Sequence, residues 1–267
     1  GYEETGDEFT LEVYRQCEGN PFLLTQLVRL LALRSPDGDA PAVPSGTVEL
    51  GKAEGVRHVI LRRLSRLSRQ SRKTLEAASV IGTTFNAALL AEVLGLSRER
   101  TAAHLEEAID MHLLLAQEEV SGRYRFAHAA FRDVIYDELA SAAREALHAK
   151  VARALERAHS AELDLHSFEL ARHYALGAGA GCGPQAVEYC IRAAESAASH
   201  CAWEEACSLW HEALELCDTL PADAPQRAWH VIAGVYERLA TTYGLMGDLQ
   251  RALEAAQAAT EHVPAEE

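Results

Sequence analysis

Residues 233–266 read AGVYERLATTYGLMGDLQRALEAAQAATEHVPAE. Apolar and small residues recur in this stretch at helical spacing, and Gly247 interrupts the pattern near its middle. The spacing predicts two helices joined by a short turn. Ala252 falls near the start of the second helix, where a small side chain lets two helices approach closely. The stretch therefore predicts a helical hairpin.

This hairpin resembles one tetratricopeptide (TPR) unit, a repeat of about 34 residues. An alignment on Ala252 places eight residues at consensus-type positions: Tyr236, Leu239, Ala240, Tyr243, Gly247, Ala256, Ala259 and Pro264. Alignments on Ala206 and on Ala186 give looser matches upstream. We expect a mainly α fold in which residues 146–267 form TPR-like helical hairpins of an α-solenoid. An unrelated helical bundle is the alternative.

The middle of the chain predicts a different architecture. Helical patterns at residues 72–81, 87–94 and 98–112 precede an apolar run at 113–117, a polar turn ending in Gly122 and an alternating run at 123–126. Ser97 is expected to cap the third helix. Three helices and a small β-hairpin outline a winged helix-turn-helix, which we assign to residues 51–145. An Arg-rich helix is expected at residues 57–73.

The first segment, residues 1–50, reads as the end of a helical domain and a linker. Its two helices break at Gly19-Asn20-Pro21, and a loop rich in Pro, Gly and Asp follows at residues 35–55. The sequence begins Gly-Tyr without a Met, so we expect an excised piece of a longer protein.

Charge is spread unevenly along the 267 residues, whose formal net charge is −15. Residues 1–55 hold 10 acidic and 4 basic side chains, residues 56–160 hold 13 and 16, and residues 161–267 hold 17 and 5. Phosphate contacts need Lys and Arg, so the acidic last segment is a poor match for nucleic acid. Only the middle segment would attract an anion.

The six cysteines lack CxxC spacing and are interpreted as buried thiols of a reducing compartment. No apolar run approaches the roughly 20 residues that a membrane span needs, and no signal-peptide pattern opens the sequence. We therefore expect a cytoplasmic protein without a membrane partner.

Four stretches, taken in order, resemble the C-terminal portion of STAND-type regulatory ATPases. The most similar are large ATP-binding regulators of the LuxR family and ATPase modules linked to cyclases or kinases. These stretches are CEGNPFLL at residues 17–24, VRHVILRRL at 56–64, AASVIGTTF at 77–85 and YRFAHAAFRDVIY at 124–136. The resemblance implies a signalling and transcription-regulating protein in which bound nucleotide holds a two-state switch closed.

The same resemblance implies residues that contact nucleotide. The Gly-x-Pro motif of the lid, which would pack on the adenine, falls on Gly19 and Pro21, and His128 is the candidate for the diphosphate. ATP or ADP is therefore the cofactor expected in a full-length parent, bound with an upstream ATPase core. The alternatives are helix initiation for Pro21 and a core hydrogen bond for His128.

We expect no enzyme activity, no catalytic residue and no metal site in this segment. Residues 46–53, GTVELGKA, nearly spell a phosphate-binding loop, but Ala53 replaces the metal-ligating Ser or Thr and no strand precedes the loop. Cys207 and His211 are spaced i, i+4, yet a structural metal site needs four ligands.

The function we expect is therefore regulatory: a protein or a small-molecule inducer binds the TPR-like region, with Tyr236 and Tyr243 on the binding face. One alternative is a nucleic-acid-binding regulator that uses the winged helix and the Arg-rich helix. It is disfavoured by the carboxylates of the candidate recognition helix, Glu99, Glu106, Glu107 and Asp110. A stand-alone TPR adaptor is the other alternative.

Overall fold

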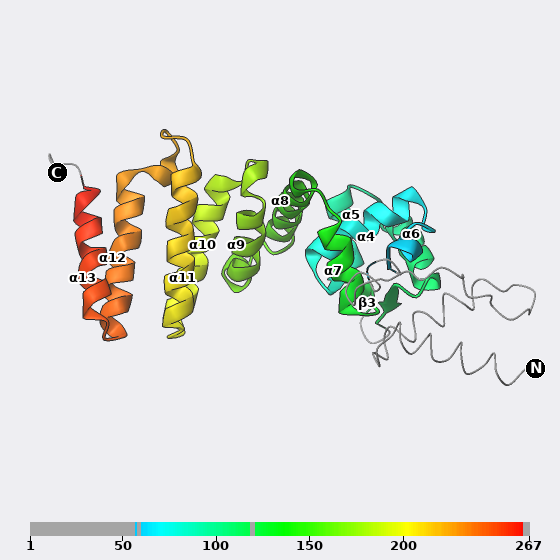
Figure 1. The fold of residues 1–267 in the computed structure, drawn as a ribbon, viewed down its shortest axis with the longest axis horizontal. Coiled ribbons are helices and arrows are strands. Elements are labelled where there is room, and N and C mark those ends of the chain that lie inside the picture. The colour runs from blue at the N-terminus through cyan, green and yellow to red at the C-terminus, as the bar shows by residue number, and fades with distance from the viewer. Residues whose placement is uncertain (1–56, 58–59, 118–120, 264–267) are drawn as a thin grey trace, which may run out of the picture. The chain divides into compact units, whose positions relative to one another are not determined.

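The computed structural model describes residue 57 and residues 60–117 and 121–263. The chain divides into two compact units, residues 1–72 and 73–267. The described residues are mainly helical, with one small three-stranded sheet (Figure 1). Within them, no helix combines the length and the apolar character that crossing a bilayer requires.

The described part of the first unit corrects the prediction of one continuous Arg-rich helix. The chain is helical through residue 64, turns at residues 65–68, and enters α4 (Arg69–Ile81). Ser65 donates its hydroxyl to the carbonyl of Arg62, and Ser68 Oγ accepts the N–H of Ser71 at 3.2 Å. Such serine contacts compete with helical hydrogen bonds. Arg63, which belongs to this Arg-rich stretch, is only 1% exposed.

In the second unit, α5 (Ala87–Leu94) and α6 (Arg98–Asp110) follow α4 as predicted. The predicted cap of α6 is present: Ser97 Oγ accepts the N–H of Arg100 at 3.3 Å. Gly95 ends α5 at φ 65°. The predicted hairpin is β2 (Leu114–Ala116) and β3 (Arg123–Phe126), paired antiparallel.

The sequence did not predict the third strand, β1 (Thr84–Asn86). It pairs antiparallel with β3, so β3 is the central strand in the order β1-β3-β2. Phe85 is its only buried residue, and it contacts the rings of Tyr124 and Phe126. The core beneath the sheet and helices consists of fully buried side chains: Leu75, Leu90, Leu105, Leu113, Leu114 and Phe131.

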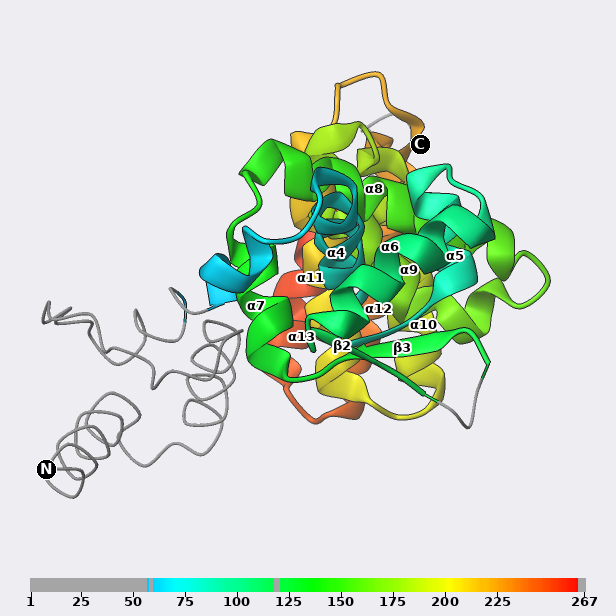
Figure 2. The same ribbon diagram turned by 90° about the vertical axis from the view of Figure 1, so that its right-hand side faces the viewer.

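From residue 129 onward the chain is a succession of helices. They are α7 (Ala129–Asp137), α8 (Ser141–Ala158), α9 (Ser167–Leu176), α10 (Gly183–Ser199), α11 (Trp203–Thr219), α12 (Trp229–Leu245) and α13 (Leu249–Glu261). Each helix from α8 to α13 packs on the next (Figures 1 and 2). Short 3-10 turns occupy Leu163–His166, Ala178–Ala180 and Pro225–Arg227.

Small residues set the close contacts in this stack. Ala194, Ala197 and Ala206 are buried where α10 meets α11, and Ala255 is buried beside α12. The distance between helix axes depends on the side chains at the contact, so alanines allow a short one. At the end of α9, a Cβ on Gly177 would lie 2.8 Å from the backbone nitrogen of Ala149 in α8.

The stack also corrects the alignment of the upstream repeats. The turn at Gly247, where φ is 80°, separates α12 from α13 as predicted. The alignments on Ala186 and on Ala206, however, both use α10, which packs extensively on α9 and on α11. One helix cannot be the second helix of one hairpin and the first helix of the next, so the alignment on Ala186 does not define a separate unit.

Candidate functional site

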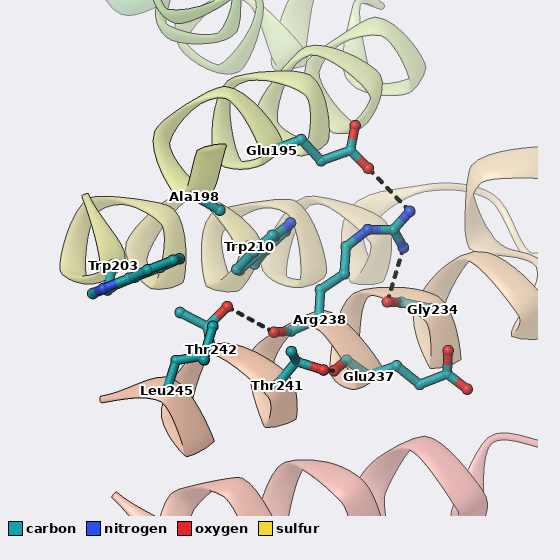
Figure 3. Close-up of a pocket in the computed structure, with 10 residues that line it drawn as sticks. All are labelled: Glu195, Ala198, Trp203, Trp210, Gly234, Glu237, Arg238, Thr241, Thr242 and Leu245. Atoms are coloured by element: carbon teal, nitrogen blue, oxygen red, sulfur yellow. Dashed lines mark hydrogen bonds and ion pairs between the residues drawn. The ribbon is translucent and has the colours of Figure 1, made fainter. Parts of the chain in front are cut away.

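A groove of about 490 Å³ lies among α10, α11 and α12 (Figure 3). Helix α11 contributes two tryptophans seven residues apart on one face, Trp203 and Trp210. The other residues that line the groove come from the two flanking helices. They are Glu195 and Ala198 from α10, and Gly234, Glu237, Arg238, Thr241, Thr242 and Leu245 from α12. The groove is shallow and open to solvent, and it is not an enclosed cavity.

Trp210 is the deepest of these side chains and is 2% exposed. Its Nε1 atom is buried and has no hydrogen-bond partner within the described part of the chain. A buried N–H left without an acceptor costs about 1–3 kcal/mol. Trp203 is only half-buried, and its ring lies at the other end of the groove from Arg238 (Figure 3).

Arg238 crosses the groove from α12 to α10. Its Nη2 atom lies 3.0 Å from Glu195 Oε1, and its Nη1 donates to the carbonyl of Gly234 at 3.0 Å. The two charged side chains are 46% and 47% exposed, so their ion pair contributes at most about 1 kcal/mol. This contact is therefore a weak one that a competing charge would exchange.

The remaining polar side chains of α12 take no part across the groove. Thr241 and Thr242 donate their hydroxyls to carbonyls one turn earlier in their own helix, at 2.9 Å in each case. Glu237 directs its carboxylate away from the two indoles (Figure 3). The groove thus presents the buried N–H of Trp210, the cation of Arg238, which can change its partner, and the carboxylates of Glu195 and Glu237.

Neither tyrosine predicted on the binding face lines this groove. Tyr243 is 6% exposed and belongs to the core, where its hydroxyl lies 2.9 Å from His211 Nε2. Its position in the interior corrects the prediction that it offers a contact surface. Tyr236 is half-buried and stacks on the ring of His262, with centroids 5.6 Å apart.

Of the predicted nucleotide contacts, Gly19 and Pro21 lie outside the described residues, as does the loop-like stretch at residues 46–53. His128 is exposed and caps the start of α7, where its Nδ1 accepts the N–H of Ala130 at 3.2 Å. It is therefore not a core histidine.

A buried polar chain joins α7, α8 and α9. The Tyr136 hydroxyl lies 2.8 Å from His148 Nε2, and His148 Nδ1 lies 2.9 Å from His173 Nδ1. Burial, followed by the nearby cations, lowers the pKa of His148 to about 4 and that of His173 to about 3. Both imidazoles are therefore neutral at neutral pH. Their hydrogen bond needs a proton on the Nδ1 atom of one ring and none on the Nδ1 atom of the other.

A second buried network joins α8, α9 and α10. The carboxylate of Glu156 accepts the hydroxyl of Tyr174 through one oxygen and that of Tyr189, at 2.8 Å, through the other. The two tyrosine rings stack with centroids 5.2 Å apart. Burial and the carboxylate raise the pKa of both phenols, so they stay protonated and donate. The network joins three helices through two buried tyrosines.

The cysteines and histidines of the described residues form no group of three that would hold a metal ion. Cys182, Cys190, Cys207 and Cys217 are buried, and burial raises the pKa of the last three. Cys201 is exposed at a turn with φ 60°, which corrects the prediction that the cysteines are all buried. Cys17 lies outside the described residues.

The outer face of α6 carries more carboxylates than basic side chains. Glu99, Glu106 and Asp110 are exposed, against Arg98 and Arg100 at the start of the helix. Such a face repels phosphate and offers few donors to base edges. The groove, which the sequence did not predict, is accordingly the better candidate. Its signal was the pair of tryptophans on one face of a predicted helix.

No protein-family model, no curated protein and no solved structure matches this chain.

Proposed function

We propose that this chain is a regulatory and protein-interaction segment of a STAND-type signalling ATPase. In this proposal residues 51–145 form a winged helix, residues 146–267 form a TPR-like arm, and the arm couples the nucleotide state to a bound partner or inducer. The observation that carries the proposal is the groove among α10, α11 and α12, which opens between successive helices of an acidic stack.

The winged-helix assignment is supported by the order of elements. A helix, a strand, two helices and two further strands follow one another, with the last strand, β3, central in the sheet. The exposed carboxylates of α6 argue that such a domain contacts protein and not DNA. In this role it transmits a change of state along the chain instead of reading a sequence.

The TPR-like assignment is supported by the hairpin of α12 and α13. Its turn falls at Gly247, Ala255 and Ala259 are buried along α13, and Leu239 and Tyr243 are buried along α12. Alternating small and bulky residues of this kind let each hairpin stack on the next, which leaves grooves between hairpins for partners.

Nucleotide titration tests the proposal that this segment lacks a complete nucleotide-binding site. We expect isothermal titration with ATP and with ADP to give weak binding at best, and no phosphate release, because the proposed contacts Gly19, Pro21 and His128 need an ATPase core to complete the site. Tight binding or turnover by this chain would contradict the proposal. A gene sequence without an ATPase core upstream of Gly1 would contradict it as well.

The groove also favours a second candidate, a stand-alone adaptor, because partner binding there needs no nucleotide. The two are distinguished by the dependence of partner binding on ATP or ADP in the longest natural form of the protein. A regulatory segment binds its partner differently in the two nucleotide states, whereas an adaptor binds it equally in both.

A further inference from the structure

The floor of the groove holds an indole N–H that has no hydrogen-bond acceptor among the described residues. This N–H belongs to Trp210, which is 2% exposed. Buried N–H groups in folded proteins almost always have a partner. In Figure 3 the nitrogen edge of the Trp210 ring points to the side on which Arg238 crosses the groove. A group that displaces the Arg238 side chain would therefore reach this N–H.

The charges around the groove select the kind of ligand. Glu195 and Glu237 lie at its rim against one cation, Arg238, and residues 161–267 hold 17 acidic and 5 basic side chains. A field of this sign repels anions and attracts cations. Glu195 already holds a guanidinium at 3.0 Å, so its position accepts a basic group.

We infer that the groove binds a short extended segment of a partner protein in which a lysine or arginine neighbours an apolar residue. The basic side chain of the segment replaces Arg238 at Glu195. A backbone carbonyl of the segment then accepts the uncovered N–H of Trp210, and the apolar side chain packs on the ring of Trp203. This inference rests on the protein-interaction role proposed above and names the chemistry of its partner.

The exchange costs little because Arg238 is already half-exposed. Glu195 trades one cation for another, and the displaced Arg238 guanidinium moves into solvent, where water replaces Glu195 and the carbonyl of Gly234 as its hydrogen-bond partners. The ion pair that breaks is half-exposed and weak. The new hydrogen bond to Trp210 satisfies a donor that has no acceptor among the described residues.

The test begins with a selection from a random peptide library on the whole chain. We expect enriched peptides to share a basic residue beside an aliphatic or aromatic one. Enrichment of acidic peptides, or none above the unselected library, overturns the inference. The best peptide is then titrated with tryptophan fluorescence as the readout. Two of the three tryptophans line the groove, so Trp229→Phe leaves only groove reporters.

Variants of the two charged residues should act in opposite directions. Glu195→Gln removes the site of the basic group and is expected to weaken peptide binding about tenfold. Arg238→Ala removes the competitor and is expected to tighten binding about two- to fivefold. Trp210→Phe removes the N–H donor, so about a fivefold loss follows.

Arg192→Ala is the matched control because it removes an exposed ion pair of α10, Arg192 with Glu188 at 3.2 Å, that does not line the groove. It should leave peptide affinity unchanged. If Arg238→Ala weakens binding as much as Glu195→Gln does, Arg238 is a contact and not a competitor, and the exchange is overturned. Failure of the peptide tests with nucleotide coupling intact rejects only this use of the groove.

Discussion

The buried pair His148 and His173 predicts a loss of stability in mild acid. Both side chains are fully buried, and their pKa values are lowered to about 4 and about 3 from the ordinary value of 6.5. Below pH 6.5 the unfolded chain takes up two protons that the folded chain refuses. The stability that these neutral histidines contribute is therefore fully present above pH 6.5, the pKa in the unfolded chain. It is lost as the pH falls towards about 4 and about 3, the pKa values in the folded chain.

The size of the effect follows from the two pKa values. Each histidine lowers the free energy of unfolding by about 1.4 kcal/mol for every pH unit below 6.5. Between about pH 7.5 and about pH 5 the pair then lowers it by about 4 kcal/mol, since both folded pKa values lie below that range. Single domains have only about 5–15 kcal/mol in total, so the loss is large.

Urea unfolding followed by circular dichroism measures this free energy across the pH range. In the double variant His148→Gln with His173→Gln, the free energy of unfolding should depend less steeply on pH. The difference in this free energy between the double variant and the natural chain should therefore change by about 4 kcal/mol over the same interval. His200→Gln, which removes an exposed histidine, is the control and should keep the steep profile. Parallel profiles for the natural chain and the double variant would refute the reasoning, as would NMR titration of these two imidazoles above pH 5.

Two further predictions concern the helix contacts. Gly177→Ala should lower the free energy of unfolding by about 1–3 kcal/mol, because the new Cβ would lie 2.8 Å from the backbone of α8. Gly244→Ala is the control: its Cβ would meet nothing within 4 Å, so it should raise this free energy by about 0.5–1 kcal/mol. Equal effects of the two variants in urea unfolding would contradict the close approach of Gly177 to α8. Glu156→Gln should cost about 1–3 kcal/mol in the same assay because one of two tyrosine hydroxyls loses its acceptor, whereas the exposed Glu261→Gln should cost nothing measurable.

The helices were predictable where a residue marks their ends. Ser97 caps α6, and Gly247 turns the chain between α12 and α13, both through local backbone effects. The strand β1 was not predictable, because three residues carry no period and only pairing with β3 makes them a strand. The break at residues 65–68 was also hidden, because it depends on serine side chains that bond to nearby backbone.

The candidate site was less predictable because it combines residues distant in sequence. The repeat alignment placed Tyr243 at a consensus-type position of its hairpin but did not show which neighbour covers it. In the structure its hydroxyl lies 2.9 Å from Nε2 of His211 in α11. Trp203 and Trp210 share a face of α11, yet only the packing of α10 and α12 around them makes that face a groove. The role of Arg238 depends on Glu195, which lies on another hairpin.

The groove lies at the least extensive junction of the C-terminal stack. Helices α10 and α11 pack extensively on each other, as do α12 and α13, whereas α11 packs on α12 less extensively. In a linear array of this kind each hairpin is held only by its neighbours. The last hairpin is therefore joined to the stack less extensively than its own two helices are joined to each other. A ligand in the groove would contact residues on both sides of this junction, so it would add to the packing that sets the angle between the two hairpins.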